Sequence, residues 1–202
     1  MPRVSLGKMT AGVAAATLIT ISGCHVDTGK RGDGKNVNIS TPFGGLHVRT
    51  NDSAVQESIG LAAYPGATLV KKNNGKGDDS ADVDMHFGSF QLRVKAVTYR
   101  TDDSINKVED FYRNDLKRYG DVITCQGNKA VGEPTRTMTG LTCEDNPHRR
   151  VSVDDSDDRD SLHLKAGSRH HQHIVGLDPD HGGTKFALVV LDLPADSEDD
   201  AK

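Results

Sequence analysis

The sequence has little of what a large hydrophobic core requires. It contains no Trp, aromatic residues make up 4% of its 202 residues, and hydrophobic residues make up 35%. The mean hydropathy of −0.54 excludes a membrane protein with several spanning helices. The 7 Pro and 21 Gly form no collagen-like or low-complexity repeat. The length fits one domain of ordinary size with short appendages.

The common catalytic and nucleotide-binding motifs are also missing from the sequence. There is no GxSxG elbow, no Walker loop, no GxGxxG after a strand pattern, no HExxH and no pair of CxxC motifs. We therefore expect neither enzyme activity nor a bound cofactor. The net charge of −4 opposes binding of nucleic acid, because neutralising phosphates requires clusters of basic residues.

The first 23 residues have the three-part organisation of an export signal. Arg3 and Lys8 provide a positive start without any acidic residue, and an apolar run of 13 residues extends from Met9 to Ile21. A membrane-spanning helix needs about 20 residues, so the run indicates a cleaved signal and not a permanent anchor. The remainder of the chain contains 23 basic and 29 acidic residues and carries a net charge of −6.

A short motif, Ile21-Ser22-Gly23-Cys24, ends this signal. An aliphatic residue and two small residues before Cys resemble the lipobox of bacterial lipoproteins, although Ile21 stands where Leu is usual. The resemblance covers only about a tenth of the chain. It implies that diacylglyceryl is attached to the Cys24 thiol, that cleavage occurs before Cys24, and that the new amino terminus is acylated. The alternative is an ordinary secreted protein in which Cys24 is incidental.

The same resemblance implies a location in the cell envelope, with the membrane as a partner through the lipid anchor. Anchoring of this kind is stable because each buried methylene contributes about 0.8 kcal/mol and a lipoprotein carries more than one acyl chain. In bacteria with two membranes, lipoproteins with Asp directly after the lipidated Cys tend to stay in the inner membrane. This sequence has His25 there, which favours the outer membrane, facing the periplasm, if the host is diderm.

The cysteine count agrees with export. If Cys24 is lipidated, Cys125 and Cys143 remain as an even pair in an oxidising compartment. They enclose 17 residues, and closing a loop of that size stabilises a fold by about 3 kcal/mol in the chain-entropy model. We predict a disulfide between them. The alternatives are two buried free thiols or a redox pair, and the second lacks the CxxC spacing.

Hydrophobic periodicity predicts one α+β domain over residues 36–193. A Gly-rich, charged segment over 24–35 is expected to be a flexible tether, and the acidic segment 194–202 a disordered tail. Period-two alternation and turn residues predict the strands of a mostly antiparallel sheet. These strands are a hairpin around 42–45, then 67–70, 81–87, 90–96, 122–125 and 141–143, and a final hairpin of 161–177 with 184–193 around a turn at 178–183.

One main helix is predicted over residues 104–119. Its apolar residues recur at spacings of three and four, and Gly120 follows as a stop signal. A short helix is expected from Asp52 or Ser53 to Ile59. The Tyr64-Pro65-Gly66-Ala67 turn, with the later Phe111-Tyr112-Arg113, Leu116 and Tyr119-Gly120, resembles a recurring arrangement in exported bacterial proteins of unknown function. That resemblance implies no activity and no catalytic residues.

Histidines are concentrated near the end of the chain. Five of the nine His lie between His163 and His181, with Asp178 and Asp180 nearby. On a strand, His171 and His173 point to the same face, and a turn over 178–183 that folds back would add His181. This set suits Zn, Cu or Ni. The alternative is that these His are solvated or hydrogen-bonded on a polar strand face.

Together these observations favour a non-enzymatic, membrane-anchored lipoprotein of the cell envelope. We expect it to bind an envelope protein, a polymer or a small ligand. The alternative function is a metal-binding protein or metal-dependent enzyme that uses the cluster from His163 to His181. A redox module built on Cys125 and Cys143 is a third hypothesis, and it predicts easy reduction by a mild thiol.

Overall fold

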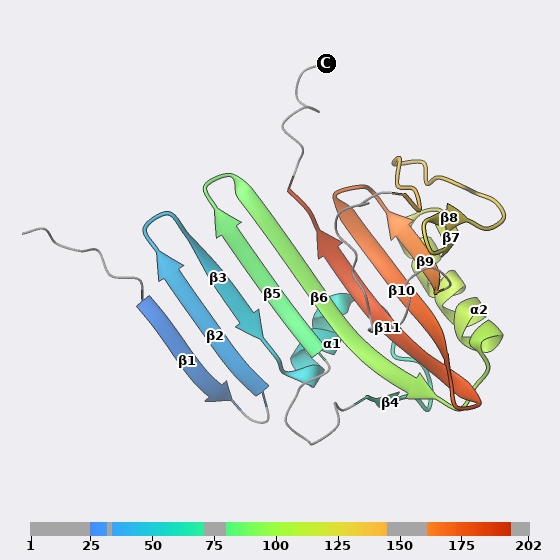
Figure 1. The fold of residues 1–202 in the computed structure, drawn as a ribbon, viewed down its shortest axis with the longest axis horizontal. Helices are drawn as coiled ribbons and strands as arrows, with labels where there is room; N and C mark the ends of the chain where they lie inside the picture. The colour runs from blue at the N-terminus through green and yellow to red at the C-terminus, as the bar shows by residue number, and fades with distance from the viewer. Residues whose placement is uncertain (1–24, 32–33, 71–79, 145–160, 195–202) are drawn as a thin grey trace, which may run out of the picture.

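Alternating apolar and polar residues build one antiparallel sheet of eleven strands (Figure 1). The computed structural model describes residues 25–31, 34–70, 80–144 and 161–194. The strand order is β1-β2-β3-β5-β6-β11-β10-β9-β7-β8, with β4 paired to β6. The strands are β1 (His25–Arg31), β2 (Gly34–Thr41), β3 (Gly44–Arg49), β4 (Thr68–Leu69), β5 (Ser80–Phe87), β6 (Phe90–Thr101), β7 (Val122–Gln126), β8 (Lys129–Ala130), β9 (Leu162–Gly167), β10 (His171–Asp180) and β11 (Gly183–Asp192).

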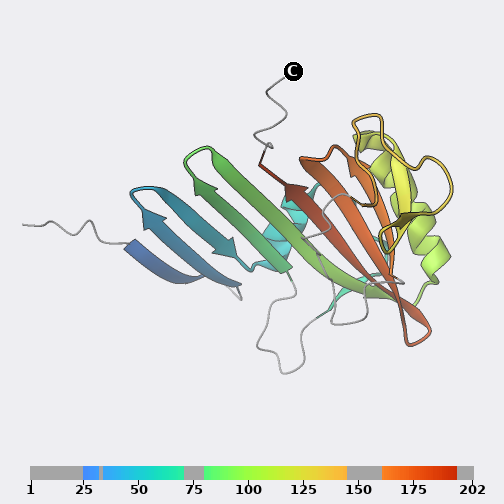
Figure 2. The ribbon, with the colours of Figure 1, turned by 45° about the horizontal axis from the view of Figure 1, so that its top comes forward.

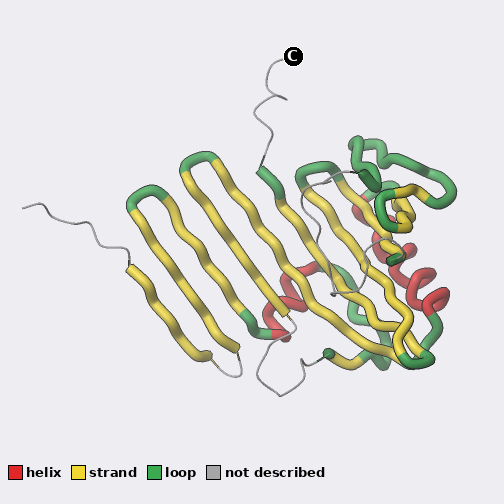
Figure 3. Tube along the Cα trace, in the orientation of Figure 1, coloured by secondary structure: helices red, strands yellow, loops and turns green. Residues whose placement is uncertain are grey.

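Two α-helices pack on the sheet, which confirms the predicted α+β class with one main helix (Figure 3). The shorter helix, α1 (Asp52–Ile59), contacts β5 and β6. The main helix, α2 (Ile105–Leu116), contacts β9 and β10 and continues into the 3-10 turn η1 (Lys117–Tyr119). Strands β1, β2 and β3 extend beyond both helices (Figure 2).

The main core lies between the two helices and strands β6, β11, β10 and β9. Val108, Tyr112 and Leu116 form the buried stripe of α2 at spacings of four, as the helical period requires. Phe186 of β11 lies among Tyr64, Tyr99 and Tyr112, with ring centroids 5.4–5.9 Å apart. Phe111 also contacts Tyr64 and Tyr112, so five of the nine aromatic residues are gathered at this one place.

The central strand β11 is buried on both of its faces. Phe186, Leu188 and Val190 belong to the core beneath the helices, while Ala187 and Val189 on the opposite face are only 2% exposed. The continuous apolar run from Phe186 predicts this position, because a covered strand need not alternate. The paired neighbours of β11 are β6 and β10.

The predicted hairpin around residues 42–45 is present, and the strands expected at 81–87 and 90–96 form a second hairpin. Strand β5 pairs with β6 as far as Phe87 with Phe90, which leaves a two-residue turn. Gly88 in that turn has φ 58°, a backbone conformation that favours glycine in tight hairpin turns. The short helix α1 is capped by Asn51, whose side chain accepts a hydrogen bond from the Ala54 N–H. Asn51 therefore takes the role expected of Asp52 or Ser53.

The sheet begins earlier than the sequence indicates. The segment expected to be a tether over 24–35 contains β1, which pairs with β2 from His25 opposite Ser40 to Arg31 opposite Gly34. Local composition disfavours a strand here, but the free edge of β2 supplies backbone donors and acceptors that an extended segment can satisfy. Strand formation at this edge therefore depends on a neighbour and not on the segment's own pattern.

Two other strand predictions are wrong in detail. Residues 161–177 form two strands instead of one, because the chain reverses at residues 168–170 and the Ser168 N–H donates to the His171 carbonyl. Residues 141–143 form no strand and make only an isolated bridge, from Thr142 to Arg136. The final turn is also shorter than predicted, since β10 continues to Asp180 opposite Gly183.

Candidate functional site

The three histidines of the predicted metal site do not come together. His171 and His173 lie on one face of β10, with ring centroids 4.9 Å apart. His181 lies in the turn at the other end of β10, roughly 25 Å further along at about 3.3 Å per strand residue. The ladder to β11 keeps β10 extended, so the turn cannot fold back. Within the described ranges, no group of three His, Cys, Asp or Glu residues is placed to hold a metal ion.

His173 packs against an aromatic ring instead. It is 4% exposed, and its ring stacks on Tyr119 at a centroid distance of 3.5 Å and an interplanar angle of 15°. Its Nδ1 atom is buried without a hydrogen-bond partner. Burial, followed by the nearby His171, lowers the pKa of His173 to about 4. His173 is therefore neutral at ordinary pH and acts as a core residue.

The neighbouring contacts attach the end of α2 to the sheet. The Tyr119 hydroxyl donates to the Gly60 carbonyl at 2.8 Å, and the Arg118 guanidinium lies over the Tyr119 ring at 5.1 Å. On the exposed side of the same face, His171 Nδ1 contacts the Asp192 carboxylate. These interactions join η1, α1 and β10, and they account for His171 and His173 without a metal.

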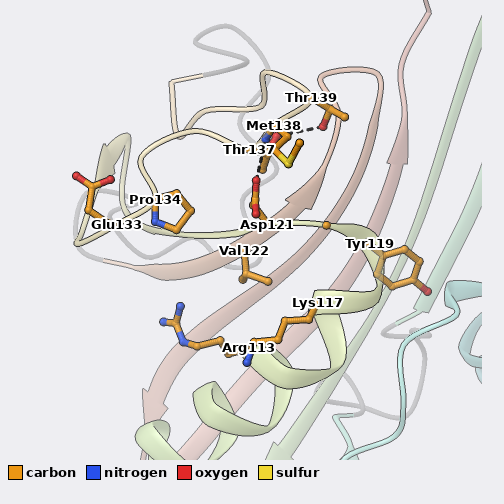
Figure 4. Close-up of a pocket in the computed structure, with 11 residues that line it drawn as sticks. Arg113, Lys117, Tyr119, Asp121, Val122, Glu133, Pro134, Thr137, Met138 and Thr139 are labelled. Carbon is orange, nitrogen blue, oxygen red and sulfur yellow. Dashed lines mark hydrogen bonds between the residues drawn. The ribbon is translucent and has the colours of Figure 1, made fainter.

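A separate hollow of about 710 Å³ opens beside the C-terminal end of α2 (Figure 4). Arg113 and Lys117 reach it from the helix, and the loop after β8 closes its other side. The hollow is lined by Arg113, Lys117, Tyr119, Gly120, Asp121, Val122, Glu133, Pro134, Thr137, Met138 and Thr139. A hollow of this size with a few converging polar groups suits a small ligand.

Hydrogen bonds hold the loop wall of the hollow in place. The Asp121 carboxylate accepts a hydrogen bond from the Met138 N–H at 3.0 Å (Figure 4). Thr137 and Thr139 both donate from Oγ1 to the Gly167 carbonyl, at 2.9 and 2.6 Å. The loop therefore presents Met138 outward, 94% exposed, from a fixed backbone.

The charged groups at the hollow are of both signs. Arg113 is already engaged, because it pairs with Glu109 and donates to Thr124 Oγ1 at 2.8 Å. Lys117, the first residue of η1, donates to the Asn114 side chain of α2. With Glu133 also in the lining, the wall suits a ligand with mixed polar groups better than a strongly anionic one. No sequence pattern predicted this site, and an apolar Met138 within the polar stretch 134–140 is its only local signal.

The predicted disulfide between Cys125 and Cys143 is present, with the two Cα atoms 5.6 Å apart. The bonded pair forms a small buried cluster with Ile123 and Leu141. The bridge closes the loop that carries residues 133–139, so it also positions the loop wall of the hollow.

Cys24 and the predicted export signal lie outside the described residues. Among the helices that the structure describes, none is long and apolar enough to cross a membrane. No family model matches the chain, and no curated protein or solved structure shows significant similarity to it.

Proposed function

We propose that the chain is a membrane-anchored bacterial lipoprotein of the cell envelope and acts as a non-enzymatic binding module. One observation carries the proposal: a positive start, a 13-residue apolar run and the motif Ile21-Ser22-Gly23-Cys24 follow one another in register. The disulfide between Cys125 and Cys143 supports it, because such bonds persist in oxidising compartments outside the cytosol.

The hollow beside α2 supports the binding role. Its walls come from a helix and from a loop closed by the disulfide, so its shape is largely set before a ligand arrives. A preformed site loses less conformational entropy on binding than a loose one. The ligand we propose is a small molecule or a segment of an envelope polymer with polar groups of both signs, which contacts Lys117, Glu133 and the exposed Met138.

Metabolic labelling with a fatty acid tests the anchor. We expect label on the wild-type chain and none on Cys24→Ala. The matched control is the double variant Cys125→Ser with Cys143→Ser, which loses the disulfide and keeps Cys24. It should incorporate label as the wild type does. An unlabelled wild-type chain, or a labelled Cys24→Ala chain, would contradict the lipoprotein assignment.

Photocrosslinking in the intact envelope tests the hollow. A photoreactive amino acid at position 138 should form an adduct with a ligand or polymer. The same group at Asn106, an exposed residue on α2 that does not line the hollow, should not form that adduct. Equal adduct formation at both positions, or none at position 138, would argue against a binding role for this hollow.

A further inference from the structure

Exposed hydrophobic side chains are concentrated at one end of the sheet. Among the described residues, five large hydrophobic side chains are exposed, and three of them lie toward β1: Val26 in β1, Phe43 in the β2–β3 turn and Phe87 in β5. Phe43 is 83% exposed and Phe87 is 45% exposed. Aromatic residues are scarce in this chain, so two exposed Phe at neighbouring positions call for a physical reason.

The two Phe occupy the tips of neighbouring hairpins. Phe43 lies in the turn between β2 and β3, and Phe87 is the last residue of β5 before its turn into β6. Gly44, directly after Phe43, pairs with Phe87 across the strands. A Cβ atom on Gly44 would lie 2.5 Å from Phe87 Cδ1, which shows that the Phe87 ring lies against the Gly44 backbone. Phe43 and Phe87 together form the Phe tips.

The Phe tips are free of charge. Residues 41–46 (TPFGGL) and 87–92 (FGSFQL) contain no Asp, Glu, Lys or Arg. The other ends of the strands differ. Arg100 and Asp180 form a salt bridge there at 2.9 Å, and Arg49 lies opposite Asp82. An uncharged tip with an aromatic side chain is suited to the interface between lipid headgroups and acyl chains, where charged side chains are costly.

The first residue of β1 lies at the same strand ends as the Phe tips. His25, the first residue of β1, pairs with Ser40, and Ser40 is three residues before Phe43. In Figure 1 the blunt end of β1, the β2–β3 turn and the β5–β6 turn all lie at the upper ends of their strands. At about 3.3 Å per residue, His25 and Phe43 are separated by roughly 10 Å along the strand direction.

No long linker separates the lipidation site from the sheet. Cys24 directly precedes His25 in the sequence, and consecutive Cα atoms are about 3.8 Å apart. A lipid on Cys24 therefore holds the first residue of β1, and with it this edge of the sheet, next to the headgroups. A flexible segment of a dozen residues, as the sequence suggested, would have left the orientation of the sheet free.

We infer that the Phe tips insert into the surface of the lipid bilayer and orient the sheet with these strand ends toward the membrane. The inference rests on the proposed lipidation of Cys24. The occupant is the bilayer itself, because the start of β1 and both Phe lie at the same ends of their strands, and residues 41–46 and 87–92 carry no charged side chain. The hollow beside α2 lies next to β7, on the other side of the sheet from β1 in the strand order.

The lack of Trp makes a fluorescence test direct. Single variants Phe43→Trp and Phe87→Trp are made in the full-length lipidated chain and reconstituted into vesicles of phosphatidylethanolamine and phosphatidylglycerol, with and without brominated acyl chains. We expect a blue-shifted emission that the brominated lipids quench at both positions. Asn106→Trp, on α2 near the opposite edge, is the matched control and should be neither shifted nor quenched.

The outcomes separate the two proposals. Emission at positions 43 and 87 that brominated lipid leaves unchanged, while mass spectrometry shows acylated Cys24, overturns the insertion and leaves the lipoprotein assignment standing. If the chain carries no acyl group, the assignment fails, and the unlipidated Trp variants are titrated with the same vesicles. Quenching of the unlipidated variants would still support insertion of the Phe tips. The absence of quenching would overturn the insertion. A blue shift that needs no vesicles and grows with protein concentration means that a second copy covers the Phe tips, which also overturns the proposal.

Discussion

The ring of Tyr119 stacks on the ring of His173 at 3.5 Å, nearly parallel at 15°. This contact joins the end of α2 to β10 and places an ionisable side chain in the core. Because His173 is buried without a partner for Nδ1, protonation opposes the fold. The contact therefore makes the stability of the domain depend on pH in a defined direction.

The first prediction concerns this pH dependence. The pKa of His173 is about 4 in the fold, below its ordinary value of 6.5, so the unfolded chain binds a proton more readily. Stability from this group is complete above pH 6.5 and is lost as pH falls towards 4, by up to roughly 3 kcal/mol. His173→Phe keeps the stacked ring and should remove that part of the slope. Urea unfolding of both proteins between pH 4 and 7 measures the pH dependence of the unfolding free energy. The same pH dependence in both proteins would refute the prediction.

The second prediction concerns the disulfide. Replacing Cys125 and Cys143 by Ser should lower the free energy of unfolding by about 3 kcal/mol, because the closed loop restricts the unfolded chain. Reduction of the wild type should lower it by a similar amount. Cys24→Ser, which leaves the bridge intact, is the control and should unfold as the wild type does. Urea denaturation with and without reductant is the measurement, and an unchanged midpoint on reduction would show that the bridge contributes nothing.

The third prediction compares two Phe of opposite exposure. Phe186 is 1% exposed among three Tyr rings, so Phe186→Ala should cost about 3–5 kcal/mol in unfolding free energy. Phe43→Ala should cost less than about 0.5 kcal/mol, since its side chain has little to lose in water. Thermal and urea unfolding of both variants provides the test. A large loss for Phe43→Ala would mean that Phe43 supports the fold, and it would weaken a membrane role.

The fourth prediction concerns Gly44. A Cβ there would lie 2.2 Å from the His86 carbonyl oxygen and 2.5 Å from Phe87 Cδ1, so Gly44→Ala must displace the hairpin tip at a cost of about 1–3 kcal/mol. Gly29→Ala in β1 meets nothing within 4 Å and is the control. Hydrogen exchange of β3 and β5 amides should accelerate in the first variant only. Equal exchange in both would show that the tip tolerates a side chain.

Several features of this protein follow from sequence periodicity and cysteine parity. The stripe of Val108, Tyr112 and Leu116 defines the main helix, since a period near 3.6 leaves one buried face. Alternation on either side of Gly88 defines the β5–β6 hairpin, and the disulfide follows from the two Cys that remain after Cys24. These features depend on residues close together in the chain or on a simple count, so no knowledge of distant neighbours is needed.

Other features depend on which segments become neighbours. A charged, Gly-rich segment becomes β1 because β2 offers it an edge. His181 is held far from His171 and His173 because β10 pairs with β11 along its whole length. The hollow likewise exists only where α2 meets the loop of residues 133–139. Every residue type other than Pro can form the backbone hydrogen bonds of a ladder. Strand pairing therefore depends on which segments become neighbours in the folded sheet.

The sequence by itself therefore determined the main helix, the hairpin around residues 42–45 and the disulfide pair, and it carries the motif on which the lipoprotein proposal rests. Only the tertiary structure brought Phe43, Phe87 and the first residue of β1 to one edge of the sheet. The physical reason is that side-chain periodicity is local, whereas the placement of strand ends depends on the register of long antiparallel ladders.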